Sequence, residues 1–162
     1  MNTITMKSKD TLSASEAQCF ATINGRIYNL LNAISLEAKM TKKKSTIPIL
    51  GKPGGGNRAT GWSGSGTMTV HYNMSVMRKL AIEYAHSGQD IYFEMQITNY
   101  DKTNNLGRQT IVLKDCNFDE IILAKFDASS DDTLQEDISF TFEDVEMPEE
   151  FAELNGLTTA IA

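Results

Sequence analysis

The sequence is poor in the residue types that most often build catalytic and metal centres. Its 162 residues include only two cysteines, two histidines and one tryptophan. Cys19 and Cys116 are far apart and have no CxxC spacing, so we expect two buried free thiols made in a reducing cytoplasm, not a zinc site. His71 and His86 fall in a predicted strand and at the end of a predicted helix, and nothing in the sequence supplies partners for a triad.

Long hydrophobic runs are also absent. The first 18 residues, MNTITMKSKDTLSASEAQ, contain no apolar stretch long enough for a signal peptide, and no segment approaches the length of a membrane span. The sequence therefore predicts one soluble domain with a sizeable core.

Phosphate-binding motifs are missing even though glycine is locally dense. Gly51 and Lys52 are followed by Pro53, which breaks the G-x-x-x-x-G-K-[ST] pattern, and no G-x-G-x-x-G occurs. The segment Gly61–Ser65 comes close to a G-x-S-x-G elbow but ends in serine. The acidic cluster near Asp131 lacks the spacing of a calcium loop. We therefore predict no catalytic residue, no metal and no cofactor, although carboxylate pairs for glycoside chemistry stay open.

Charge is divided unevenly along the chain. Residues 1–88 carry 11 basic and 4 acidic side chains, a net charge of +7, whereas residues 89–162 carry 4 basic and 17 acidic ones, a net charge of −13. Such a chain can neutralise itself internally, or place the basic face of one copy on the acidic face of another. The alternative is that both halves are simply solvated.

The most unusual stretch is Gly51–Gly66, which contains seven of the eleven glycines. Glycine favours backbone mobility, but this stretch also carries a large aromatic anchor and two cations. We expect a long surface loop that becomes ordered against another molecule; a mobile loop without a role is the alternative. Together with the preceding lysine cluster, the candidate assembly-interface residues are Lys42, Lys43, Lys44, Lys52, Gly54, Gly55, Gly56, Arg58 and Trp62.

Local patterns in the first half predict strands, one hairpin and one helix. Ala17–Ile23 is a strand candidate, and Asn24-Gly25 after it is a strong signal for a tight hairpin turn. Ala33–Met40 alternates as a half-buried strand, which the lysine cluster should interrupt while protecting a sheet edge. Thr67–Tyr72 is β-branched and aromatic. A helix is predicted to follow, because Met77, Leu80, Ala81 and Tyr84 form an apolar stripe. Asn73 or Ser75 can cap its N-terminus, and Gly88 is well placed to end it.

The second half predicts mostly strands. They are expected over residues 91–97, 110–113, 121–126 and 138–142, with Cys116 and Phe118 in a further apolar stretch. The fold class is therefore mainly β: an antiparallel β-sandwich or barrel with one α-helix. We expect a flexible N-terminal arm over residues 1–15, the β-barrel domain over 16–147 and a C-terminal tail over 148–162.

The pattern as a whole resembles the tail tube proteins of PBSX-like prophages and related contractile-tailed phages of Gram-positive bacteria. The resemblance runs from about Ser13 to Phe151. It rests on SASEAQCFATING, LEA within Ala33–Met40, ILGK and GWSGSGTMTVHY, LKDCNF and ISFTFEDVEMPEEF.

This resemblance implies the fold shared by phage tail tubes and the type VI secretion tube protein. It implies hexameric rings that stack into a hollow tube inside a sheath, with strands of neighbouring subunits joined into one inner barrel. The expected partners are further copies of the chain, a tail sheath protein, and baseplate and tail-terminator proteins, while DNA passes through the lumen without specific binding. Assembly is expected in the bacterial cytoplasm, and the final location in a virion or tail-like particle. The alternative is a β-sandwich glycan-binding module or a glycan-acting enzyme of a tail tip.

Overall fold

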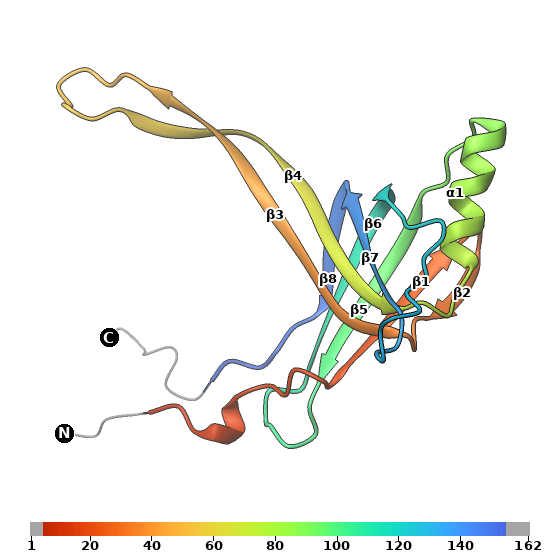
Figure 1. The fold of residues 1–162 in the computed structure, drawn as a ribbon. Coiled ribbons are helices and arrows are strands. Elements are labelled where there is room, and N and C mark those ends of the chain that lie inside the picture. Colours follow the sequence, from red (N-terminus) through yellow and green to blue (C-terminus); the bar gives the residue numbers. More distant parts are fainter. Residues whose placement is uncertain (1–4, 155–162) are drawn as a thin grey trace.

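The protein is a single antiparallel sheet bent into two layers, with a long hairpin that projects from it (Figure 1). The computed structural model describes residues 5–154. The strand order is β2-β1-β5-β6-β7-β4-β3, and β8 pairs with β6 outside this path. In chain order the elements are η1 (Ser8–Asp10), β1 (Ala17–Ile23), β2 (Arg26–Asn29), β3 (Ala33–Ile47), β4 (Gly56–His71), α1 (Val76–Ser87), β5 (Phe93–Tyr100), β6 (Arg108–Glu120), β7 (Gln135–Phe142) and β8 (Asp144–Glu149).

Strand β6 links the two layers. Its first part pairs with β5 and β8, and its last residues pair with β7. The β5–β6 register shifts between the pairs Phe93↔Cys116 and Met95↔Leu113, and Asp115 within the shift has a positive φ of 53°. An extra residue of this kind bends a strand and increases its twist, which lets β6 pass from one layer to the other.

The core lies between the two layers. The alternating strands predicted around residues 91–97 and 138–142 supply much of it. Its largest fully buried side chains are Phe140, Met68, Met95, Leu113, Ile138 and Cys116. Within residues 5–154 the structure is mostly antiparallel sheet with a single α-helix, as the sequence predicts.

Both cysteines behave as small buried hydrophobes, which confirms the prediction from their context. Cys19 and Cys116 are free and belong to the core cluster. Burial raises the pKa of each thiol to about 12. These thiols therefore stay protonated at neutral pH and are poor nucleophiles.

The helix ends as predicted, and its N-cap position is one of the two predicted residues. Gly88 has a φ of 72° and its N–H donates to the Tyr84 carbonyl, which is the expected left-handed stop. The N-cap residue is Ser75 and not Asn73, and the Ser75 side chain makes no capping hydrogen bond. Arg78 fixes this end of α1 instead: its guanidinium donates to Glu136 Oε2 (2.7 Å), the Met74 carbonyl and the Ile122 carbonyl.

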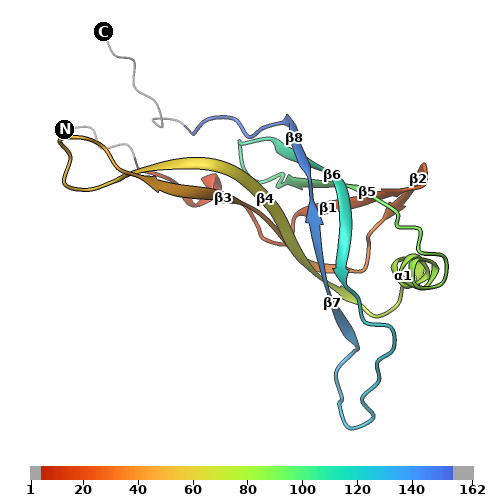
Figure 2. The same ribbon diagram turned by 90° about the horizontal axis from the view of Figure 1, so that it is seen from above.

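The predicted strands differ from the structure in three places. Strand β3 does not stop at the lysine cluster but continues to Ile47. It is also not half-buried, since Ile34 and Met40 are 46% and 51% exposed. The reason is that β3 lies at the edge of the sheet, where it pairs only with β4 among the described strands. Residues 121–126 form no strand; this apolar stretch belongs to the loop between β6 and β7 that projects in Figure 2. Strand β8 escaped prediction because Asp144–Glu149 is exposed throughout and contains Pro148.

Both terminal segments meet the loop between β5 and β6. The Ser13 N–H donates to Asp101 Oδ2 (3.0 Å), and the Ala152 N–H donates to the Leu106 carbonyl (2.8 Å). Residues 1–4 of the expected N-terminal segment and 155–162 of the expected C-terminal tail lie outside the described residues. The division of the chain into N-terminal segment, domain and tail stays a prediction. Among residues 5–154 there is no helical segment with the length and hydrophobicity of a membrane span.

Candidate assembly interface

The outer part of the β3–β4 hairpin leaves the body as a two-stranded ribbon. Strand β7 pairs with β4 only from Gly64 to His71. Residues 56–63 of β4, towards the turn of the hairpin, therefore pair only with β3. We call residues 41–63 the arm (Figure 1). Apart from Gly56, every residue of the arm is exposed. The eight β4 residues 56–63 give it a reach of about 26 Å, at about 3.3 Å per residue.

The prediction of a long loop over Gly51–Gly66 is wrong, and the reason lies at the root of the arm. Only residues 48–55 connect the strands; the later glycines belong to β4. Gly64 and Gly66 lie opposite Phe142 and Phe140 of β7. A Cβ on either glycine would lie 2.4–2.5 Å from the facing ring. These glycines therefore make room for two core phenylalanines, a cross-strand arrangement known to stabilise glycine in sheets.

The tip of the arm is an ordered turn. The Lys52 N–H donates to the Ile49 carbonyl (3.2 Å), and Gly51 between them has a φ of 80°. A positive φ at the third position is the mark of a type II turn and requires glycine or asparagine. Leu50 at the corner of this turn is fully exposed, at 103% of its reference area.

Positive charge covers the arm without local neutralisation. Lys42, Lys43 and Lys44 lie opposite Trp62, Gly61 and Ala59 on β4. The ion pairs found within residues 5–154 involve none of these three lysines. Trp62 contacts Phe142, with ring centroids 6.2 Å apart, and stays 41% exposed.

All nine candidate residues lie on this one arm. Lys42, Lys43, Lys44, Gly56, Arg58 and Trp62 are on its strands, and Lys52, Gly54 and Gly55 are in its tip. Sequence reasoning missed the exposed apolar residues Ile47, Ile49 and Leu50 beside them. The signal that could have found them is the apolar run Ile47–Leu50, which lies between a lysine cluster and a glycine run.

Lysine and carboxylate groups also pair along β8 on the body. Lys114 Nζ of β6 lies 2.8 Å from Glu146 Oε1. This hydrogen bond, together with the attraction between the two charges, raises the pKa of Lys114. Glu149 of β8 likewise lies 3.6 Å from Arg108 Nε of β6, so two of the three carboxylates of β8 are paired with cations of β6. Within the described residues, no group of three or more histidines, cysteines or carboxylates is arranged to hold a metal.

The two-layer β body with one helix has counterparts among solved structures. The fold is similar to a chain in the cryo-EM structure of the anti-feeding prophage baseplate, with a TM-score of 0.65, 14% identity and coverage of 91% of this chain and 97% of that chain. It is also similar to a chain of the sheath–tube complex of an extracellular contractile injection system (PVC), with a TM-score of 0.60, 12% identity and coverage of 80% and 87%.

The profile of the phage tail tube protein family matches residues 4–149, and the chain belongs to this family. The phage-like element PBSX protein XkdM of Bacillus subtilis (strain 168) is 32% identical over 148 residues, which cover 91% of this chain and 97% of the relative. YqbM of the same organism is 32% identical over 145 residues, covering 90% and 95%. The resemblance to PBSX-like prophage proteins is thereby confirmed, and the chain is a structural subunit of a tail tube.

Proposed function

We propose that the chain assembles into hexameric rings that stack into the hollow tube of a contractile phage tail or a tail-like particle. The observation that carries this proposal is the arm. An isolated two-stranded hairpin is at best marginally stable in water, and this one presents exposed apolar side chains and unpaired lysines along its length. A segment built in this way gains its stability from the surface that covers it, and in a tube that surface belongs to neighbouring copies.

Open sheet edges support the same conclusion. Strand β3 pairs with β4 on one side, and within the described chain its other side has no partner over its 15 residues. Long unpaired edges invite aggregation unless they are protected or joined. In a ring, the edges of adjacent copies join into a closed inner barrel, which removes them. Lysines 42–44 keep the edge soluble in the free subunit.

The remaining parts of the proposal concern partners and place. The bipolar charge, +7 against −13 in the two halves, suits ring-on-ring contact. The net charge of −6 lowers affinity for DNA, so a genome or effector passes through the bore without being held. The solved structures of similar fold contain a sheath, a baseplate or a tube terminator. We propose counterparts of these as partners, assembly in the bacterial cytoplasm, and a mechanical role without catalysis or a cofactor.

Size-exclusion chromatography combined with negative-stain electron microscopy tests the proposal. Purified protein is examined over a range of concentrations and salt. We expect rings, or tubes of constant diameter, at high protein concentration. A strict monomer under every condition would overturn the proposal. Turnover of glycans by that monomer would favour the alternative of a glycan-acting enzyme.

A further inference from the structure

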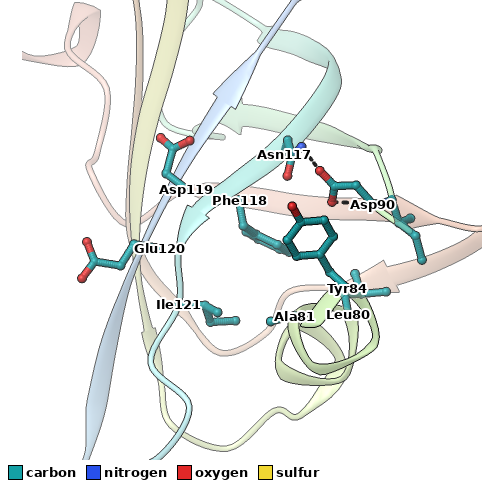
Figure 3. Close-up of a pocket in the computed structure, with 10 residues that line it drawn as sticks. Leu80, Ala81, Tyr84, Asp90, Asn117, Phe118, Asp119, Glu120 and Ile121 are labelled. Atoms are coloured by element: carbon teal, nitrogen blue, oxygen red, sulfur yellow. Dashed lines mark hydrogen bonds between the residues drawn. The ribbon is translucent and has the colours of Figure 1, made fainter. Parts of the chain in front are cut away.

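The tip of the arm has a complementary groove at the other end of the molecule. The groove lies between α1 and the end of β6 and encloses about 260 Å³ (Figure 3). Its apolar lining comes from Leu80 and Ala81 of the helix and from Phe118 and Ile121 on the β6 side. Tyr84 of the helix also lines the groove and is 53% exposed (Figure 3).

One carboxylate at the groove is held in place. Asp90 Oδ2 accepts a hydrogen bond from Asn117 Nδ2 (2.6 Å), and its Oδ1 accepts one from the Ile91 N–H (3.0 Å). Asp119 and Glu120 also belong to the lining, but their carboxylates point away from the helix (Figure 3). The groove thus combines an apolar floor with one oriented negative charge at its rim.

A single chain cannot bring its own tip to its own groove. The tip and α1 lie at opposite ends of the molecule in both views (Figures 1 and 2). Any contact between them must therefore join two copies. Such a contact uses different surfaces on the two partners, and it repeats from copy to copy into a ring or a filament.

We propose that Leu50 of one copy enters the groove between α1 and β6 of another copy, with Lys52 beside Asp90. This inference rests on the proposed tube function and names the surface that receives the arm. The turn at the tip is already ordered by the bond from the Lys52 N–H to the Ile49 carbonyl, so little conformational freedom is lost on docking. Leu50 supplies an apolar side chain that water surrounds in the free subunit, and Lys52 follows two residues later with the complementary charge.

Cross-linking between two singly substituted chains tests the contact directly. Leu50→Cys and Ala81→Cys are made separately in the full chain and mixed under mild oxidation. We expect a disulfide between the two variants in the mixture and little in either variant alone, because a disulfide needs Cα atoms about 4.4–6.8 Å apart. The native Cys19 and Cys116 are buried and do not compete. Gly61→Cys, which lies on the exposed arm away from the tip, is the matched control and should not cross-link to Ala81→Cys.

Charge exchange tests the polar part of the contact. Lys52→Glu or Asp90→Lys alone should weaken self-association by about two- to fivefold, the range of an exposed pair. Mixing the two variants should restore association, because both kinds of contact between unlike chains then bring opposite charges together. Leu50→Asp should weaken association by roughly tenfold or more, since it removes a buried leucine.

The outcomes separate this contact from the tube itself. Tubes without the specific cross-link would overturn the docking of Leu50 and leave the tube function standing. The specific cross-link without rings or tubes would support the contact and contradict the stacked-ring proposal. Absence of both would contradict both.

Discussion

Replacing Gly66 by alanine adds one methyl group at the place where the arm meets the core. The new Cβ would lie 2.5 Å from Phe140 Cζ and 2.9 Å from the Glu37 carbonyl oxygen. Both distances are below 3.0 Å, closer than Cβ atoms come to other heavy atoms in proteins. Phe140 is completely buried, so its ring has no free space to enter. The backbone of β3 or β4 must therefore move.

The expected cost follows from this geometry. Overpacking a well-packed core by one methylene typically costs about 1–3 kcal/mol. Because a backbone oxygen and a buried ring are both too close, we expect a loss of about 2–3 kcal/mol in the free energy of unfolding. For a protein of this length this lowers Tm by roughly 4–12 °C.

Gly61→Ala provides the matched control on the same strand. No atom lies within 4 Å of a Cβ at this position, and its φ is not positive. Alanine restricts the unfolded chain, so we expect no change or a gain of about 0.4–1 kcal/mol. Thermal and urea unfolding of the wild-type protein and both variants, followed by circular dichroism, gives the comparison.

Equal Tm values for the two variants would refute this reasoning, since a glycine that only supplies mobility should tolerate alanine equally at both sites. The double variant Gly66→Ala/Phe140→Leu gives a further check. If the clash with the ring is the cause, the two substitutions should be non-additive, with the second recovering part of the loss caused by the first.

Three further predictions concern the arm, the helix and the N-terminal segment. Changing all three of Lys42–Lys44 to glutamate should reduce the yield of tubes seen by electron microscopy, while the Tm of the monomer stays within about 2 °C, because exposed substitutions rarely change stability by more than about 0.5 kcal/mol. Arg78→Met should cost about 3–5 kcal/mol in urea unfolding, because it leaves the carboxylate of Glu136, 3% exposed, buried without its partner. Hydrogen bonds from the Thr103 and Ser13 N–H groups lower the pKa of Asp101. Stability from Asp101 is therefore present above its unfolded pKa of about 3.9 and is lost as pH falls through the lower folded pKa. Asp101→Asn should remove this pH dependence and speed amide hydrogen exchange at Ser13.

Each of these predictions has a contrary result. Unchanged tube yield after the lysine reversal would remove electrostatics from the assembly proposal. An Arg78→Met protein as stable as the wild type would mean that the bond to Glu136 contributes little to fixing α1. If protection of the Ser13 amide is the same at pH 2 and pH 6, Asp101 does not hold the N-terminal segment.

The elements that the sequence predicts correctly depend on the backbone preferences of one or two residues. Asn24 and Gly25 adopt the positive φ values that a two-residue hairpin requires, and Gly88 ends α1 in the left-handed region. Period-two alternation over residues 91–97 and 138–142 likewise identifies strands with a buried face. The resemblance to tail tube proteins rests on short motifs that follow one another in the same order along most of the chain.

Only the tertiary structure decided the form of the candidate interface. The sequence predicted a loop at Gly51–Gly66, since a run of glycines favours mobility unless a neighbour fills the space above them. Here Phe140 and Phe142, more than seventy positions away in the sequence, occupy the space above Gly66 and Gly64. Pairing with β7 at these positions keeps both glycines in strand β4. In the same way the groove that receives Leu50 exists only because α1 packs beside β6. Local pattern determined the mainly β fold class with one helix, and the order of the motifs carried the resemblance to tail tube proteins. Which residues of the arm are strand, which are tip and what faces them depended on contacts between distant segments, and no local preference encodes such contacts.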